Sequence, residues 1–526
     1  MNRLFTLLAG FLLLLGAHGA ASARPSPPDG AFPLWGTLER GPHQIGFRVI
    51  EAQDDSRSWR PERAPDGGAV AGGSGRPVRI SIWYPAERRG RRMTYADYVR
   101  VPGTGPFRDL NAVLARRETN LLQRIMRGQG AEALLRTPMA ASSGAAPARG
   151  RFPLVGYTAG LNEYLQHGNF VLCEYLASHG YVVVTVPQVG TTSLRLNFGI
   201  DPVSLETQMR DMEFALAQVR RLPVADPARV AMVGHSMGGV SSVIGAMRDS
   251  RVDAVVGLDA SYSARPLLPT LTASPFYSVR NLRVPWLDLR RAANEELDSS
   301  ALQGLRHSDR YQMLVRGVSH ADFTSYPMIA ANFPTDMAGR TPAHASRVYE
   351  LVVRSIRAFL DSSFADPLRI ETALRALAGA PQGAGLVETF VHLRREPVPL
   401  SSDELAFLIG RDGLEPVLAR HAPAREKALL NAAGYRLLEW QRTDEAILVF
   451  ARNVRLNPGD SNLLDSLAEG YLAAGRLSEA AATYREVLRA LPSDAALDER
   501  ARDALRRNAA AQLASIEELI RFAGER

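Results

Sequence analysis

The 526-residue sequence contains a single cysteine, Cys173, and a single lysine, Lys427. One cysteine excludes an intrachain disulfide, even in an oxidising compartment, because the bond needs two thiols. Cys173 lies in an amphipathic helical pattern over 170–176, which indicates a small buried hydrophobic residue and argues against a cysteine nucleophile. The formal charge of +7 is therefore carried by arginines, which are scattered among acids without a long basic run. This distribution argues against a nucleic-acid-binding protein.

Motifs of metal and phosphate chemistry are also missing. No HExxH, Walker or EF-hand pattern occurs, and no dinucleotide-binding fingerprint precedes a suitable helix. We therefore expect neither a metal ion nor an organic cofactor. Hydrophobic residues make up 46% of the chain and charged residues 22%, which is ordinary for a folded globular protein. At this length we expect two or more domains.

Long apolar runs are confined to the N-terminus. Arg3 precedes an apolar run over 4–15, and Ala21-Ser22-Ala23 supplies small residues at the spacing of a cleavage site. The run is short for a spanning helix, which needs about 20 residues, although a retained anchor is the alternative. We predict a signal peptide over 1–23 and export to the periplasm or medium of a Gram-negative-type bacterium. No later run is long enough for a stable transmembrane anchor.

Residues 24–365 alternate β-branched apolar runs with helical patterns, which is typical of a mostly parallel sheet covered by helices. Apolar residues at three- and four-residue steps predict a helix over 205–219. Segments 64–75 and 137–150 are expected to be loops. The helical stretch 109–135 between them is a candidate lid, or equally a solvated insertion. Strands are expected at 78–84, 153–157, 181–186, 229–233, 252–258, 284–289 and 311–315.

From residue 427 the sequence becomes repetitive. Three residue types recur at an offset of 34 residues: Ala446 and Ala480, Phe450 and Tyr484, and Pro458 and Pro492. This is the period and pattern of the tetratricopeptide repeat, in which small residues lie where two helices cross and proline marks the break. We predict an all-α tetratricopeptide-like domain over 427–526, with a capping helix over 498–522, although chance spacing in ordinary helical hairpins is the alternative. Residues 366–426, with a helix-start signal at Ser401 and Glu404, are expected to form a helical linker.

The segment 229–247 has the pattern of a nucleophile elbow. A buried-strand pattern over 229–233 runs into Gly234-His235-Ser236-Met237-Gly238-Gly239, and a helical pattern follows over 240–247. In a G-x-S-x-G elbow the serine lies on a strained turn between strand and helix, and glycines permit their close approach. Ser236 is therefore the predicted nucleophile of an α/β-hydrolase fold. His235 is an intervening residue and is not expected to be the base.

A serine nucleophile needs a base and a carboxylate that orients it, and in this fold they follow in the order serine, acid, histidine. His320, on the loop after the last expected strand, is the predicted base, whereas His307 precedes that strand and would lie at its far end. Two acids fit this order, because Asp259 ends one strand and Asp288 lies in the next. Asp253 precedes its strand and would lie at the wrong end.

Short motifs between residues 76 and 323 carry a family resemblance. They are Arg76-Pro77-Val78, Ile82-Trp83-Tyr84-Pro85, Phe152-Pro153-Leu154-Val155, Leu176-Ala177-Ser178-His179-Gly180-Tyr181-Val182-Val183, the elbow, Gly257-Leu258-Asp259-Ala260 and Arg316-Gly317-Val318-Ser319-His320-Ala321-Asp322-Phe323. Together they resemble the platelet-activating-factor acetylhydrolase family, which is related to dienelactone-hydrolase-like esterases. The resemblance implies that the acid follows the strand after the elbow, which selects Asp259 over Asp288. Asp322 matches the family pattern as well, and we interpret it as a loop-capping carboxylate.

Two backbone amides are expected to form the oxyanion hole. Met237, the residue after the nucleophile, supplies one, and the resemblance implies that Leu161 supplies the other. Relatives usually have a histidine before Gly160, where this chain has Ala159. A backbone donor does not need that side chain, so the departure bears on the rigidity of the loop and on the acyl pocket.

These residues predict a serine esterase that works through an acyl-enzyme. The resemblance implies short acyl chains on small or lipid-like esters, including phospholipids. An acyltransferase or amidase with the same triad is one alternative. A protein whose repeats bind a partner, with the hydrolase domain as scaffold, is the other.

Overall fold

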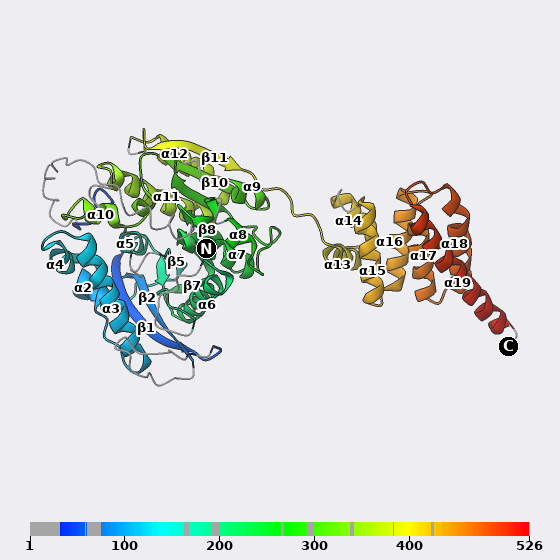
Figure 1. Cartoon of the computed structure of the whole chain (residues 1–526), viewed down its shortest axis with the longest axis horizontal. Helices are drawn as coiled ribbons and strands as arrows, with labels where there is room; N and C mark the ends of the chain where they lie inside the picture. Colours follow the sequence, from blue (N-terminus) through cyan, green and yellow to red (C-terminus); the bar gives the residue numbers. More distant parts are fainter. Residues whose placement is uncertain are drawn as a thin grey trace. The chain divides into compact units, whose positions relative to one another are not determined.

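The computed structural model describes residues 32–57, 59, 75–161, 168–191, 200–264, 268–292, 299–336, 341–381, 383–421 and 425–524. The chain forms two compact units, Met1–Glu396 and Pro397–Arg526 (Figure 1). The predicted signal peptide over 1–23 and almost all of the expected loop over 64–75 lie outside the described residues. Among the helices that are described, none is long and apolar enough to cross a membrane.

The first unit is built on an 11-stranded sheet in the order β11-β10-β9-β8-β7-β5-β6-β2-β1-β4-β3. The six strands β5 to β10 are parallel to one another, whereas β2 is antiparallel to both β1 and β6. Each of the seven expected strands overlaps an observed one. The strands are β1 (Gln44–Asp54), β2 (Arg76–Ala86), β3 (Arg91–Thr94), β4 (Pro138–Ser143), β5 (Phe152–Thr158), β6 (Val182–Thr185), β7 (Ala225–His235), β8 (Ala254–Leu258), β9 (Trp286–Arg291), β10 (Arg310–Val315) and β11 (Val387–Leu393).

Helices cover both faces of this sheet. Alternate residues of β7 divide between two hydrophobic clusters, with Ala231 and Val233 in one and Val230 and Met232 in the other. Because successive strand residues point to opposite faces, the two clusters lie on opposite sides of the sheet. The first cluster includes α5 (Phe170–Ser178) and α11 (Ala345–Ala365), and the second includes α6 (Pro202–Val219) and α7 (Met237–Arg248). Burial on both faces explains why the central strands are continuous apolar runs in the sequence.

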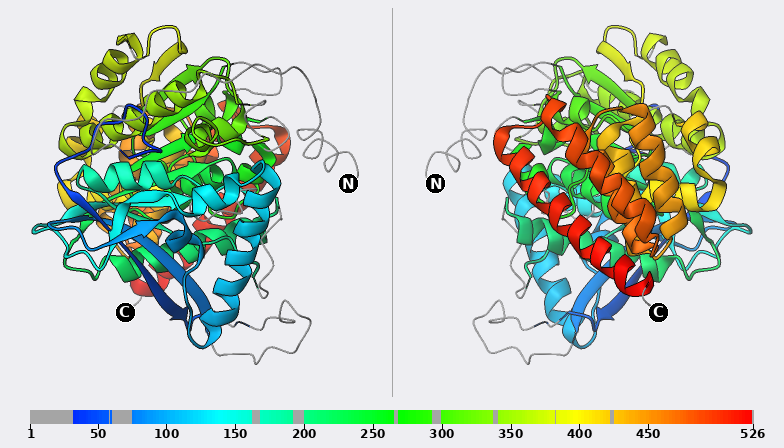
Figure 2. Two further views of the ribbon diagram at one scale, coloured as in Figure 1. Left: turned by 90° about the vertical axis from the view of Figure 1, so that its left-hand side faces the viewer. Right: turned by 90° about the vertical axis from the view of Figure 1, so that its right-hand side faces the viewer.

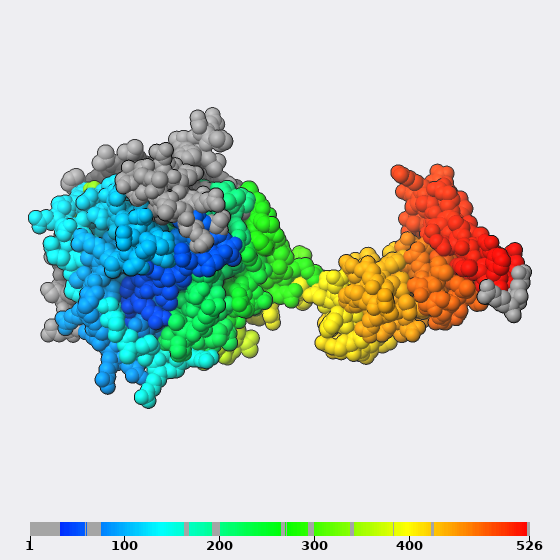
Figure 3. Space-filling view, turned by 90° about the horizontal axis from the view of Figure 1, so that it is seen from below, coloured from blue at the N-terminus to red at the C-terminus, as the bar shows by residue number. Residues whose placement is uncertain are grey.

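The stretch 106–143 differs in part from expectation. The candidate lid over 109–135 is helical, forming α3 (Pro106–Ile125) and α4 (Gly130–Leu135), which pack with α2 (Tyr95–Val99) beside β1 and β2 (Figures 1 and 2). The expected loop over 137–150 contains a strand, because β4 pairs in parallel with β1 and antiparallel with β3. Its small residues resemble a loop in composition, but they are buried at the edge of the sheet. The blue and cyan surface in Figure 3 is formed by the N-terminal part of the first unit, which includes this stretch.

The prediction of one helical linker over 366–426 is wrong, because this segment is divided between the two units. Its first half belongs to the first unit, because α12 (Ile370–Gly379) packs on α11 and β11 pairs antiparallel with β10. Its second half forms α13 (Ser402–Asp412) and α14 (Leu414–Arg420), whose apolar residues are buried in the second unit. The helix start at Ser401 has the expected capping box with Glu404. Apolar side chains in both halves therefore complete the two cores.

The second unit is a row of helices in chain order (Figure 2, right). After α14 come α15 (Lys427–Glu439), α16 (Thr443–Leu456), α17 (Ser461–Ala473), α18 (Leu477–Ala490) and α19 (Glu499–Gly524). Helix α17 begins 34 residues after α15, and α18 begins 34 residues after α16. The recurring residues Ala446, Ala480, Phe450 and Tyr484 are fully buried. The helical period therefore matches the sequence repeat, while the assignment to tetratricopeptide repeats stays a prediction.

Candidate active site

Ser236 lies on a sharp turn between β7 and α7. Its backbone has φ 55° and ψ −124°, a conformation that is costly for a residue with a side chain. A Cβ atom on Gly234 would lie 2.0 Å from the Gly238 carbonyl oxygen, and one on Gly238 would lie 2.0 Å from the Thr158 oxygen. A Cβ on Gly239 would lie 2.3 Å from that of Ala260. The glycines of the motif are therefore required by close packing around the serine.

Hydrogen bonds hold this turn against the end of β8. The amide of Ser236 donates to the Leu258 carbonyl, and the amide of Ser261 donates to the Ser236 carbonyl, both at 3.0 Å. Asp259, which directly follows Leu258, also has a positive φ of 41°. The serine and the aspartate are thus held on adjacent strained turns at the carboxyl ends of the neighbouring parallel strands β7 and β8.

Asp259 and His320 are directly hydrogen-bonded. His320 begins the short 3-10 helix η4 (His320–Phe323) after β10, and its Nδ1 lies 2.6 Å from Asp259 Oδ2. The Asp259 side chain is 3% exposed, whereas that of His320 is 36% exposed, so the ring is accessible from solvent. Arg291 contributes its backbone amide at 3.3 Å from Asp259 Oδ1 and its Nε at 3.4 Å from Oδ2.

These neighbours set the ionisation of the pair. Burial by itself raises the pKa of Asp259, but the hydrogen bond and charge of His320, together with the charge of Arg291, lower it overall. The partial burial of the His320 ring, followed by the charge of His235, lowers the pKa of His320 despite its bond to Asp259. The arrangement favours an ionised carboxylate beside a neutral imidazole at neutral pH.

The competing acids and histidine lie in other networks. Asp288 is buried, where it accepts hydrogen bonds from the Tyr262 hydroxyl at 3.0 Å and from Gln312 Nε2 at 2.9 Å, and burial raises its pKa. The ring of His307 contacts the Glu396 carbonyl at 3.1 Å. Asp322 caps η4, accepting from the Ser319 amide at 2.7 Å. Asp253 accepts from the Val230 amide at the start of the parallel strands.

The loop predicted to contribute to the oxyanion hole packs directly on the elbow. A Cβ atom on Gly160 would lie 2.8 Å from Ser236 Cβ, so the loop that leads into Leu161 approaches the serine closely. Met237 is the first residue of α7, and the first amides of a helix have no intrahelical acceptor. Both predicted donors therefore lie on segments that adjoin Ser236. Residues 162–167, which follow Leu161, lie outside the described part of the chain.

Two glutamines hold this loop in place. Gln188 Nε2 and Gln208 Nε2 donate to the Ala159 carbonyl at 2.5 and 3.0 Å. Gln208 also accepts a hydrogen bond from Ser241 of α7, which joins the loop to the helix that begins after the nucleophile. No sequence pattern identifies these glutamines, because they are distant along the chain from the loop they bind. They fix the position of Ala159, the residue before Gly160.

Two further side chains adjoin the predicted nucleophile and base. Ser261 Oγ lies 3.4 Å from Ser236 Oγ, and its side chain is buried. The His235 ring stacks on that of His320, with centroids 4.6 Å apart, and its Nε2 lies 3.1 Å from the His320 carbonyl oxygen. Ser261 follows the predicted acid by two residues, so its position near the site could have been inferred from the sequence. Only the fold reveals the stacking of the two histidines.

Within the described residues, no group of three or more histidine, cysteine, aspartate or glutamate side chains is arranged to hold a metal ion.

Comparisons with known proteins add little to this geometry. No protein family and no curated protein matches the sequence. Among solved structures, the chain is similar to a ferulic acid esterase from Streptomyces cinnamoneus, with 20% sequence identity and a TM-score of 0.45 over 61% of this chain and 90% of that chain. The first unit is a mixed α/β sheet covered by helices, an architecture consistent with the α/β-hydrolase fold.

Proposed function

We propose that the first unit is a serine esterase in which Ser236 is the nucleophile, His320 the base and Asp259 the orienting acid. The observation that carries the proposal is the 2.6 Å contact between His320 Nδ1 and Asp259 Oδ2 at the sheet edge where the Ser236 turn lies. Because Nδ1 is occupied by the carboxylate, Nε2 is the ring nitrogen left to take a proton from serine.

The reaction follows from these positions. Ser236 Oγ attacks the ester carbonyl carbon while its proton passes to His320 Nε2, and the amides of Leu161 and Met237 stabilise the oxyanion. The intermediate collapses by breaking the bond to the alcohol oxygen, which leaves with the proton from His320. Water then attacks the acyl-enzyme, giving its proton to His320, and collapse releases the carboxylic acid and returns the proton to Ser236.

The substrate class in this proposal is a small or lipid-like carboxylic ester with a short acyl chain. It is supported by the motif resemblance to platelet-activating-factor acetylhydrolases and dienelactone-hydrolase-like esterases. The same acyl-enzyme serves an acyltransferase or an amidase, so product analysis with added alcohols and amines separates transfer from hydrolysis.

The direct test compares Ser236→Ala with the unaltered protein on p-nitrophenyl esters of increasing acyl length. We expect turnover of short esters to fall by at least a thousandfold in the variant. Ser363→Ala is the matched control, because the Ser363 hydroxyl donates to the Phe359 carbonyl one turn earlier in α11 and bonds no other residue in the described part of the chain. Turnover that survives in Ser236→Ala, with normal folding, would refute the assignment.

Export and partner binding are proposed on sequence patterns alone. The pattern over 1–23 supports export, which N-terminal sequencing of the protein from a periplasmic extract tests. The 34-residue period supports a protein partner for the second unit, which binding assays with residues 397–526 as bait would test.

A further inference from the structure

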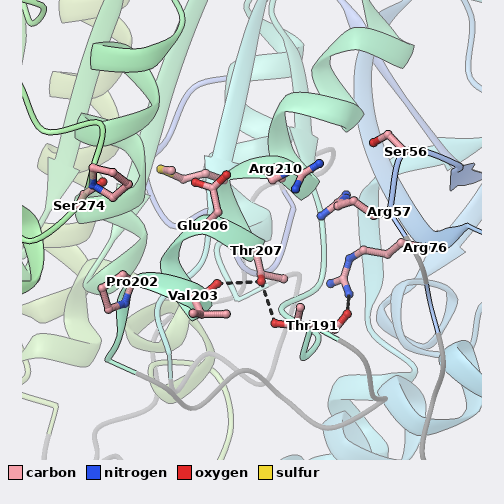
Figure 4. A pocket seen from close by; sticks show the side chains of 12 residues that line it. Ser56, Arg57, Arg76, Thr191, Pro202, Val203, Glu206, Thr207, Arg210 and Ser274 are labelled. Carbon is pink, nitrogen blue, oxygen red and sulfur yellow. Dashed lines mark hydrogen bonds between the residues drawn. The ribbon is translucent and has the colours of Figure 1, made fainter.

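A cavity of about 570 Å³ lies in the first unit beside the N-terminal half of α6 (Figure 4). Its walls come from the turn after β1, the first residue of β2, the segment after β6 and α6 itself. Thr191 in its wall follows β6, and Ser236 follows β7. Because β6 and β7 run in the same direction, the cavity lies at the same end of the parallel strands as Ser236. None of Ser236, Asp259 and His320 lines it. Among the described residues, three arginines and one glutamate line the cavity, and the partners of these side chains decide its chemistry.

Arg76 forms part of the wall and is fully engaged there. It is 2% exposed, and its Nε and Nη2 donate to the two oxygens of Asp211 at 2.7 and 2.6 Å. Its remaining donors reach the carbonyl oxygens of residues 189–191 at 2.7 to 3.1 Å. Arg76 therefore fixes the segment after β6, and it has no N–H group left for a ligand.

The one acid in the lining is also engaged. Both carboxylate oxygens of Glu206 accept hydrogen bonds from Arg248 Nη1 of α7, at 2.7 and 2.9 Å. This ion pair compensates the charge of Glu206 and directs it toward α7. Glu206 is therefore not the counter-ion of the other two arginines.

Arg57 and Arg210 both have N–H groups that bond none of the described residues. Arg57 uses Nε for Asp54 at 2.6 Å and Nη2 for Asp211 at 2.8 Å, while its Nη1 has no hydrogen bond to any residue that the structure describes. Arg210 has neither an ion pair nor a hydrogen bond with the described residues. Figure 4 shows the guanidinium ends of Arg57 and Arg210 turned toward one another. Asp54 and Asp211 already compensate the charge of Arg57, and Glu213 interacts electrostatically with Arg210. What the two arginines offer an anion is therefore N–H donors, together with the charge of Arg210, which has no ion pair among the described residues.

A hydroxyl pair completes the cavity. Thr207 Oγ1 donates to the Val203 carbonyl at 2.8 Å, so in its 2.9 Å contact with Thr191 Oγ1 the donor is Thr191. The Thr191 oxygen then keeps its lone pairs for a donor such as a ligand hydroxyl.

We propose that this cavity binds a small hydroxylated organic anion, whose carboxylate or phosphate group lies between Arg57 and Arg210. The planar donor fork of arginine suits the paired oxygens of both groups. The volume leaves room for several carbon atoms beyond the anionic group. The site is distinct from the triad, yet it borders α6, whose Gln208 holds the oxyanion loop at Ala159.

The test is calorimetric titration of the full protein with citrate, gluconate and inorganic phosphate, with uncharged sorbitol as the control ligand. We expect at least one anion to bind, sorbitol not to bind, and the affinity for the anion to fall as salt increases. Arg210→Gln should weaken binding at least tenfold without changing turnover of p-nitrophenyl acetate. Arg92→Gln is the matched control, because Arg92 is an exposed arginine on β3 that does not line the cavity.

Three results would overturn the proposal: no binding of any anion, equal affinity in Arg210→Gln, or loss of binding in Ser236→Ala. The last result would place the ligand at the catalytic serine. Arg210→Lys keeps the charge and loses the fork, so it serves if Arg210→Gln fails to fold, and it should weaken binding by a smaller factor. Since Ser236→Ala is expected to bind normally, failure here is distinguishable from failure of the esterase proposal.

Discussion

Asp259 Oδ2 lies 2.6 Å from His320 Nδ1, although 61 residues separate the two in sequence. Asp288, which also fits the order of the triad in the sequence, is buried against Tyr262 and Gln312 instead. The fold therefore distinguishes two acids that the order of residues alone leaves equivalent.

This difference predicts opposite results for two matched variants. Asp259→Asn should lower kcat by about three to four orders of magnitude, because His320 loses the carboxylate that fixes its tautomer and stabilises its charged form. Asp288→Asn should lower kcat by less than tenfold, since its partners lie outside the reacting groups. Steady-state kinetics on a short p-nitrophenyl ester measures both effects. A larger loss from Asp288→Asn would show that the acid is misassigned.

The pH profile of kcat/KM reports the pKa of the base in the free enzyme. His320 acts when neutral, and its pKa is lowered by burial and by the charge of His235, so the midpoint of the acidic limb should lie below the ordinary histidine pKa of about 6.5. In His235→Asn one of these causes is removed, which raises the pKa of His320. The acidic limb of the profile should therefore move to higher pH. An unchanged limb, or a shift to lower pH, would contradict this role of His235.

Ser261 should assist the nucleophile. Its hydroxyl lies 3.4 Å from Ser236 Oγ, a long O–H···O contact that a small rotation of either side chain would shorten into a hydrogen bond orienting the attacking oxygen. Loss of one such bond costs about 0.5–1.5 kcal/mol, so Ser261→Ala should lower kcat about twofold to tenfold. Ser261→Thr, which keeps the hydroxyl, should restore most of the rate. Equal kcat in the alanine variant and the unaltered protein would exclude the contribution.

Two truncations test the domain boundary. A chain that ends at residue 396 keeps α12 and β11, and we expect it to fold and to hydrolyse small esters at close to the full rate. A chain that ends at residue 365 exposes the edge of β10 and loses the buried residues Ile370, Leu374 and Leu386, so we expect it to aggregate. Solubility and thermal unfolding measure the difference. Equal stability of the two would mean that 366–396 is a linker after all.

Local patterns explain which parts of this fold the sequence reveals. The parallel strands are continuous apolar runs, and the elbow places its residues within a single short segment, so both are visible without the fold. β11 pairs with β10 across about 70 residues, and β4 consists of small residues that also suit a loop, so neither leaves a local signal. The glutamines at 188 and 208 meet Ala159 only after the sheet has formed. The sequence therefore indicates the proposed reacting groups more completely than the side chains that hold them in place.

The central claim is that Ser236 is an activated nucleophile, and covalent labelling tests it most directly. The full protein is treated with a fluorophosphonate probe, digested, and mapped by mass spectrometry. We predict a single stoichiometric adduct on Ser236, formed at a rate that falls sharply in Asp259→Asn and absent from Ser236→Ala. No adduct on the folded protein, or an adduct on another residue with Ser236 unmodified, would contradict the account.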